Sequence, residues 1–183
     1  MSAKIQQLYE QTLVIRSQVG DELAFQELLT LYGPHLLHFT RKMMQTSSHL
    51  VEDITQEIWL AIYKGLPGLL DAGKFRPWAF RIARDRIYRE YRRRKLAVEP
   101  LDESHVEDLT AAGEVDASVD VEELQCGLGG LSPQHREVLM LCFFEEMSYE
   151  EIASVTGSTL GTVRSRIHYA KRALRNALER KTS

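Results

Sequence analysis

The stretch SYEEIASVTGSTLGTVRSRIHYAKRAL, residues 148–174, begins acidic, ends basic and carries the local signals of a helical hairpin. Ser148 and Glu151 have the spacing of a capping box, in which each side chain bonds the backbone N–H of the other residue at the start of a helix. Gly157 can adopt the left-handed conformation that ends a helix. The sequence therefore predicts a short helix through Val155, followed by a tight turn.

A second helix is expected after this turn, with one apolar face. The residues of that face recur at helical spacing: Val163, Ile167, Ala170 and Leu174. Ala153 is small where the two helices would cross closely, and the Ala-x3-Gly-x5-Val spacing is typical of a helix-turn-helix, whose second helix enters the major groove of DNA. The alternative is a solvated cationic helix packed on its hairpin partner, which the shared register of cap, alanine, glycine and apolar stripe disfavours.

The exposed face of the second helix carries residue types that contact DNA. Thr162 and the helix N-terminus, where N–H groups are free, are expected to meet a phosphate. Side chains one turn further along reach base edges, and this role is assigned to Arg164, Ser165 and His168. Three further cations are expected to neutralise backbone phosphates: Arg166, Lys171 and Arg172.

Charge is unevenly distributed, although the whole chain of 183 residues carries a net charge of only −3. Residues 74–95 carry a local net charge of +8 and residues 159–181 one of +6. Between them, residues 96–135 hold ten acids and no Lys or Arg. Two basic segments separated by an acidic one indicate two nucleic-acid-binding parts joined by an anionic tether.

Helical spacing of apolar residues predicts an all-α fold. In the N-terminal part we expect one helix that closes near Gly33 and Pro34, a short helix over HLLHFTRKMM, a third capped by Ser48, and a long basic helix over residues 75–95. The expected organisation is two small helical domains, 1–95 and 120–183, joined by a flexible acidic linker over 96–119.

Composition excludes several classes of protein. The hydrophobic fraction of 44% supports a packed core. No apolar run is long enough to cross a bilayer and the first ten residues lack the layout of a signal peptide, so a cytoplasmic protein is expected. The two cysteines, Cys126 and Cys142, cannot form a metal cluster by themselves, and no metal or cofactor is expected. Scattered histidines and the lack of a phosphate loop or catalytic triad argue against an enzyme.

The segment FRPWAFRIARDRIYREYRRRK, residues 75–95, combines aromatic rings with cations. Aromatic faces stack on unpaired bases while cations follow the phosphates, as in proteins that hold single strands. Phe80 falls on the apolar stripe and is expected in the core. For Trp78 and Tyr88 the sequence does not decide between a place in the core and a contact with nucleic acid.

Three segments in order resemble the extracytoplasmic-function (ECF) sigma factors of bacterial RNA polymerase. VEDITQEIWLAIYKGL resembles the region 2.1–2.2 helix, FRPWAFRIARDRIYREYRRRK the following region 2.3–2.4 segment, and LSPQHREVLMLCFFEEMSYEEIASVTGSTLGTVRSRIHYAKRAL region 4. The resemblance covers nearly the whole chain. It implies a promoter-specificity subunit with core RNA polymerase (the β′ coiled coil and the β flap), promoter DNA and an anti-sigma factor as partners.

The resemblance also implies roles for individual residues. Those matching the family's β′-binding positions are Asp53, Gln56, Glu57 and Trp59, for which an ordinary acidic helix face is the alternative. Those matching the positions that capture the −10 element are Trp78, Arg81, Arg84, Asp85 and Tyr88. Asp85 departs from the family, where Asn is common; a carboxylate cannot donate to a base, which changes what this position can recognise. Region 4 would read the −35 element.

The sequence leaves an alternative interpretation for the function of the chain and another for its linker. The alternative function is that of a helix-turn-helix regulator with an N-terminal sensing or dimerisation domain, which the basic aromatic segment disfavours.

The resemblance implies that the acidic linker threads the polymerase near the RNA path; the alternative is that it is simply a soluble spacer. Its roughly 24 residues could extend about 80 Å, enough to separate two DNA-contacting domains.

Overall fold

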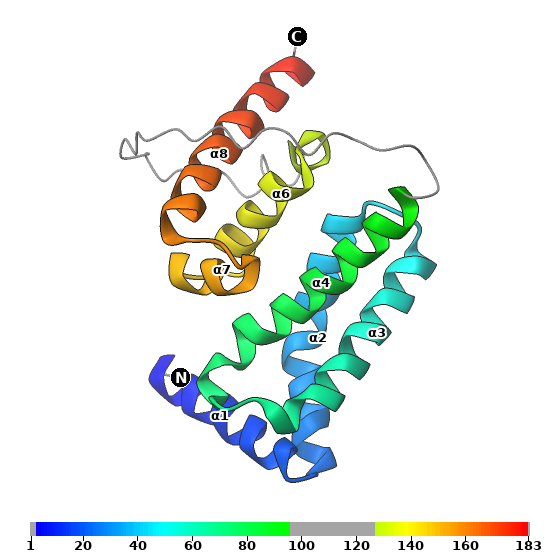
Figure 1. Ribbon diagram of the computed structural model, residues 1–183, viewed down its shortest axis with the longest axis vertical. Helices are drawn as coiled ribbons and strands as arrows, with labels where there is room; N and C mark the ends of the chain where they lie inside the picture. Colours follow the sequence, from blue (N-terminus) through cyan, green and yellow to red (C-terminus); the bar gives the residue numbers. More distant parts are fainter. Residues whose placement is uncertain (1–2, 96–126, 183) are drawn as a thin grey trace. The chain divides into compact units, whose positions relative to one another are not determined.

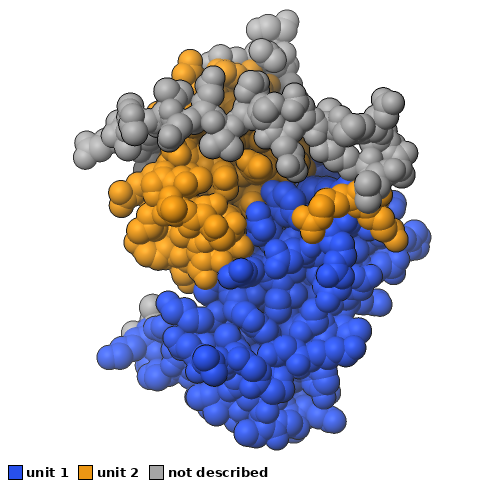
Figure 2. Space-filling model, in the orientation of Figure 1, with its two compact units in different colours: residues 1–91 blue, residues 92–183 orange. Residues whose placement is uncertain are grey.

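The computed structural model describes residues 3–95 and 127–182, and every element in these two ranges is a helix (Figure 1). The chain divides into two compact units, residues 1–91 and 92–183, which Figure 2 colours separately. The predicted all-α class with two helical parts is confirmed. The expected acidic linker, 96–119, lies outside the described residues.

Residues 3–95 form four α-helices and two short 3-10 helices, and only the last turn of the fourth α-helix extends beyond the N-terminal unit. Their bounds are α1 (Ala3–Gln18), α2 (Glu22–Met44), α3 (Ser48–Gly65), η1 (Leu66–Gly68), η2 (Ala72–Lys74) and α4 (Phe75–Lys95). Each α-helix contributes a buried apolar stripe, for example Leu13 of α1, Leu36 of α2, Ile58 of α3 and Ile87 of α4, all 0 or 1% exposed. These stripes form one core, which fixes the faces that α3 and α4 turn to the solvent.

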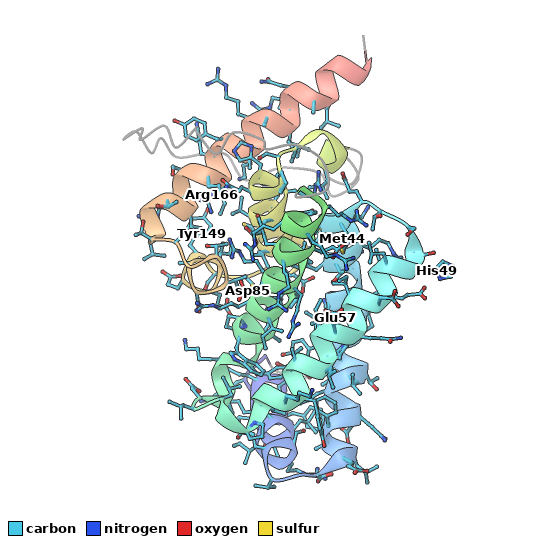
Figure 3. All side chains as sticks on the ribbon, turned by 45° about the vertical axis from the view of Figure 1, so that its right-hand side comes forward. Met44, His49, Glu57, Asp85, Tyr149 and Arg166 are labelled. Carbon is cyan, nitrogen blue, oxygen red and sulfur yellow. The ribbon has the colours of Figure 1, made fainter. Side chains whose placement is uncertain are left out.

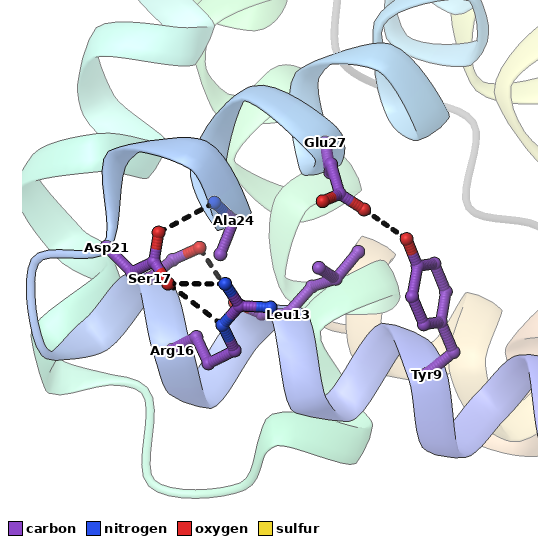
Figure 4. A network of polar contacts seen from close by, with 7 residues as sticks. All are labelled: Tyr9, Leu13, Arg16, Ser17, Asp21, Ala24 and Glu27. Atoms are coloured by element: carbon purple, nitrogen blue, oxygen red, sulfur yellow. Dashed lines mark hydrogen bonds and ion pairs between the residues drawn. The ribbon is translucent and has the colours of Figure 1, made fainter.

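Polar contacts join α1 to α2 across the turn between them (Figure 4). The Asp21 carboxylate caps α2 by accepting from the Ala24 N–H (3.1 Å) and pairs with Arg16 (2.7 Å). These two partners lower the pKa of Asp21, the backbone N–H contributing most. Tyr9 donates a further hydrogen bond to Glu27.

Helix α2 corrects the prediction of a break at Gly33 and Pro34. One helix runs from Glu22 to Met44 with Pro34 inside it. A proline here removes one helical hydrogen bond. Buried side chains on both sides of it, including Leu28 and Leu36 at 0% exposure, hold the two halves on the same core. Tertiary packing thus overrides the local signal.

The start of α3 and the helix α1 also differ from expectation. Ser48 is the first residue of α3 rather than its cap, and Ser47 takes the cap position without a side-chain hydrogen bond. The predicted count of four helices in this unit is right, but α1 was not among them, and two expected helices are merged into α2.

The C-terminal unit contains η3 (Leu128–Gly130), α6 (Pro133–Leu139), η4 (Met140–Phe144), α7 (Tyr149–Thr156) and α8 (Leu160–Thr182). Ser132 caps α6 by accepting from the His135 N–H, with Pro133 in the first turn. The buried Arg136 side chain donates to the carbonyls of Leu128 (3.0 Å) and Leu131 (2.9 Å) and so ties η3 to α6. The segment η4 is a π-helix, with a hydrogen bond from the Glu145 N–H to the Met140 carbonyl (3.1 Å).

Candidate nucleic-acid interface

The predicted capping box at the start of α7 is present. The Ser148 N–H donates to Glu151 Oε2 (2.8 Å), and the Glu151 N–H donates to Ser148 Oγ (3.2 Å). Two of the backbone donors that a helix start leaves free are thereby satisfied. The box fixes where α7 begins, and with it the position of the turn that follows eight residues later.

The turn between α7 and α8 is closed by hydrogen bonds at both helix ends. Gly157 has φ +65° and ψ +28°, the left-handed conformation predicted for it, and its N–H bonds the Ala153 carbonyl. That carbonyl also accepts from the Ser158 N–H (3.1 Å). Thr159 then caps α8, because its Oγ1 accepts from the Thr162 N–H (3.2 Å).

This cap changes the expectation for Thr162. Its N–H was predicted to be free for a phosphate, but it is bonded to Thr159, whose hydroxyl also lies 2.9 Å from the Thr162 hydroxyl. The Thr162 side chain remains exposed. A phosphate contact at this position would therefore use the hydroxyl rather than the backbone.

The predicted apolar stripe of α8 is confirmed as its core face. The exposed fractions of its four members are 0% for Val163, 3% for Ile167, 0% for Ala170 and 1% for Leu174. Because these residues face the core, Arg164 and Arg172 are left exposed. The stripe thus determines which side chains α8 presents to the solvent.

Two of the three residues predicted to reach base edges, Ser165 and His168, are half-buried and make contacts within the protein. The Ser165 hydroxyl donates to the Thr162 carbonyl (3.1 Å). The His168 ring lies edge-on to Tyr169, with 5.3 Å between ring centroids, and its buried Nδ1 has no hydrogen-bond partner within residues 3–95 and 127–182. Arg164 is the exposed member of the three.

Two of the three cations predicted to bind phosphates contact other side chains of the C-terminal unit. Arg166 (Figure 3) donates from Nη1 to Ser158 Oγ at 3.3 Å and is half-buried. The Lys171 ammonium lies 5.1 Å from the centroid of the Phe143 ring, within cation–π range. Arg172, the third of the set, is exposed.

In α4, Phe80 belongs to the core as predicted, since it is 0% exposed and packs edge-on against Phe39. Trp78 is half-buried and lies over the end of α3. A Cβ on Gly65 would come within 3.0 Å of the Trp78 ring, so this glycine permits the close packing. Trp78 is therefore at least partly a packing residue.

The remaining α4 candidates form a connected group. The Arg84 guanidinium lies 4.6 Å from the Tyr88 ring centroid and 3.5 Å from the Asp85 carboxylate. Arg81 and Asp85 are exposed, one helical turn apart (Figure 3 labels Asp85). Arg89 continues this exposed face at the same spacing and was missed, although the i, i+4 pattern in the sequence could have identified it.

On α3, Asp53, Gln56 and Glu57 are exposed at the spacing of one helix face, as their predicted role requires. Trp59 is half-buried and packs edge-on against Phe25, with 5.9 Å between the ring centroids. Leu60 lies on the face one turn beyond Gln56 and is 53% exposed. An exposed leucine among polar residues is a further candidate for contact with a protein partner. It was not among the residues predicted from the acidic motif.

We also searched the described residues for metal sites and for membrane-spanning helices. Among residues 3–95 and 127–182 no cluster of metal-ligating side chains occurs. In the same ranges, none of the helices has the length and apolar character needed to span a membrane.

Known families match both units. Residues 28–96 match Sigma-70 region 2, and residues 121–174 match Sigma-70 region 4. The ECF RNA polymerase sigma factor SigE of Mycolicibacterium smegmatis is 32% identical over 90% of this chain and 66% of its own length. SigL of Mycobacterium tuberculosis is 34% identical over 81% of this chain and 87% of its own.

Solved structures show the same fold. The sigma factor RpoE, in complex with the anti-sigma factor NepR from Bartonella quintana, matches with a TM-score of 0.65 at 26% identity, covering 85% of this chain and 96% of the other. CnrH, in complex with the cytosolic domain of CnrY, matches with a TM-score of 0.67 at 23% identity, covering 93% and 97%.

Proposed function

The chain belongs to the sigma-70 family, among its extracytoplasmic-function RNA polymerase sigma factors, and from this membership we propose that it joins core RNA polymerase and directs initiation at a specific set of promoters. It acts as a specificity subunit in the cytoplasm and performs no catalysis of its own. A regulator with an N-terminal sensing domain would not account for the region 2 match over residues 28–96.

The observation that carries this function is the helix-turn-helix of α7 and α8, held by the capping box and the buried stripe. Helix α8 lies with its core face fixed, so its opposite face enters the major groove of the −35 element. Arg164, Ser165 and His168 are the candidates for base contacts, and Thr162 and Arg172 for phosphate contacts.

Region 2 supplies the second DNA-binding surface and the polymerase-binding surface. Residues 1–95 form this domain and residues 120–183 form region 4. The α4 residues proposed to capture the melted −10 strand are Trp78, Arg81, Arg84, Asp85 and Tyr88, in which aromatic and cationic groups adjoin. On α3, Asp53, Gln56 and Glu57 bind core polymerase, whereas the packing of Trp59 on Phe25 gives it a supporting role.

An inhibitory partner follows from the relatives. RpoE of Bartonella quintana was solved with an anti-sigma factor bound. We propose that this chain is restrained in the same manner by an anti-sigma protein, which would be released when transcription is required.

The test is transcription in vitro from a promoter library with core polymerase, with and without the full-length chain. The expected result is initiation at a subset of promoters that share −35 and −10 elements and are silent with core polymerase alone. If the chain binds DNA but core polymerase gains no promoter-specific initiation, the sigma function is refuted. A triple Asp53→Ala, Gln56→Ala, Glu57→Ala variant should abolish initiation while leaving binding to the −35 duplex intact.

A further inference from the structure

We propose that Arg166 and Lys171 are positioning residues that set the rotation of α8 about its axis, and so choose which side chains face the −35 element. The inference rests on the proposed function of α8 as the reader of that element. It assigns to these two cations a role different from phosphate neutralisation, the role that their charge alone suggests.

The two cations flank the buried stripe. They are five residues apart in α8, which places them roughly 140° apart around its axis. The stripe of Val163, Ile167 and Ala170 lies between them, with each residue at most 3% exposed. Both cations are half-buried, whereas Arg164 and Arg172 on the same helix are exposed. One cation thus bounds each edge of the core face.

At one edge, Arg166 bonds the turn. Its Nη1 lies 3.3 Å from Ser158 Oγ, eight residues earlier and directly after the hinge glycine Gly157. Its positive charge also disfavours protonation of His135 on α6, whose pKa is lowered first by burial and then by the Arg166 guanidinium. Arg166 therefore ties the second turn of α8 to the loop before it.

At the other edge, Lys171 packs on η4. Its ammonium lies 5.1 Å from the Phe143 ring centroid. It also lies near the adjoining Cys142, where burial raises the pKa of the thiol and the Lys171 charge acts in the opposite direction. A lysine covers apolar surface with its methylene stem while its ammonium remains near water, so this contact combines packing with a cation–π interaction.

Together the two contacts oppose rotation in both senses. An apolar stripe alone tolerates some rolling of a helix, because hydrophobic burial is non-directional. Recognition needs side chains held within about 10–20° of their productive orientation. A hydrogen bond at one edge and a ring contact at the other supply this constraint, and they keep Ser165 and Arg172 on the side opposite the core.

The test measures binding of the full-length chain to two duplexes over a range of salt concentrations: a −35 element selected in the transcription assay, and a scrambled duplex. Removing a phosphate contact weakens both duplexes alike and reduces the salt slope by about 1. We expect this behaviour from Arg172→Ala, the matched control. For Arg166→Ala and Lys171→Ala we expect the ratio of specific to scrambled affinity to fall about tenfold, with the salt slope unchanged.

Ser158→Ala separates position from charge, because it removes the partner of Arg166 and leaves every cation in place. We expect it to lower the affinity ratio as Arg166→Ala does, and to have no further effect in the Arg166→Ala background. Lys171→Met, which keeps the stem on Phe143, should retain more selectivity than Lys171→Ala. Circular dichroism melts of all variants check that the C-terminal unit stays folded.

The inference is overturned if Arg166→Ala lowers the salt slope by about 1 and weakens both duplexes equally, or if Ser158→Ala has the same selectivity as the unmodified chain. If instead the unmodified chain shows no preference for any −35 duplex, the proposed function of α8 fails, whatever the variants do. The two failures are therefore distinguishable in one set of titrations.

Discussion

The carboxylate of Glu57 on α3 lies 3.7 Å from the guanidinium of Arg86 on α4, so one residue of the proposed polymerase-binding face is paired with the proposed −10-binding helix (Figure 3 labels Glu57). The Glu57 side chain is 54% exposed, and an exposed pair of this kind contributes at most about 1 kcal/mol to stability. The ion pair adds little to the stability of the fold, so substitution of Glu57 should mainly affect the proposed binding of core polymerase.

The first prediction follows from this pair. Glu57→Ala should weaken core polymerase binding about tenfold and lower the unfolding free energy by less than about 1 kcal/mol. Arg86→Ala removes the same ion pair but leaves the carboxylate available, so it should not weaken polymerase binding. Fluorescence anisotropy with core polymerase and urea unfolding measure the two quantities. Glu22→Ala, which removes an exposed acid on α2, is the control; an equal loss from both acid variants would contradict the assignment.

The capping box gives a second prediction. Ser148→Ala removes the side-chain acceptor for the Glu151 N–H and should destabilise the start of α7 by about 1 kcal/mol. Hydrogen exchange of the α7 amides in the full chain measures this, because it reports on one helix at a time. Ser154→Ala, an exposed serine inside the same helix, should leave exchange unchanged or slow it slightly. Faster exchange in Ser154→Ala than in Ser148→Ala would show that the box is not what holds this helix.

Asp85 gives a third prediction, because it is an exposed acid on the basic helix α4, which is proposed to bind the −10 element. Its side chain is 62% exposed and lies 3.5 Å from Arg84. Asp85→Asn removes one negative charge and adds a donor, so single-stranded −10 DNA should bind a few-fold more tightly. The preferred base at one −10 position should also change, as read by binding to a panel of singly substituted strands. Glu52→Gln makes the same charge change on α3 and should alter neither quantity. An unchanged base preference in Asp85→Asn would exclude Asp85 from base contact.

The fourth prediction concerns pH. Burial and the Arg166 charge hold the pKa of His135 below its ordinary value of about 6.5. The unfolded chain then binds the proton more readily than the folded one, so the stability contribution is complete above about pH 6.5 and is lost as pH falls towards the folded pKa. Urea unfolding of the C-terminal unit should show this loss, and His135→Gln should reduce it.

Arg166→Ala provides an independent check on His135. Removing the repelling charge should raise the pKa of His135, which an NMR titration of its ring protons measures directly. A downward shift, or none, would mean that the guanidinium does not lie near the imidazole in solution.

Local signals predicted the C-terminal unit well. The box of Ser148 and Glu151, the left-handed Gly157 and the stripe from Val163 all lie within a short stretch, so adjacent residues determine the structure. The roles of Arg166 and Lys171 could not be predicted in this way. The contact of Lys171 with Phe143 depends on a π-helix 28 residues earlier, and the spacing of apolar residues carries no signal for it.

The N-terminal unit was predicted less well, for two physical reasons. Pro34 is a strong local break signal, but burial on both sides of it outweighs one lost hydrogen bond. Helix α1 is apolar on two faces, since Leu13 is buried while Ile5 and Ile15 are each 54% exposed. Its sequence therefore lacks the one-sided stripe by which an amphipathic helix is detected.

Under the proposed role of Lys171, the length of the π-helix η4, and not only its residue types, would affect promoter choice. Its hydrogen bond from Glu145 to Met140 spans five residues, where an α-helix would span four. Deleting one residue here would let the segment close as an α-helix and would turn Phe143 by roughly 100° away from Lys171. Over evolutionary time this segment should therefore exchange one apolar residue for another freely, while insertions and deletions in it would change which genes the polymerase transcribes.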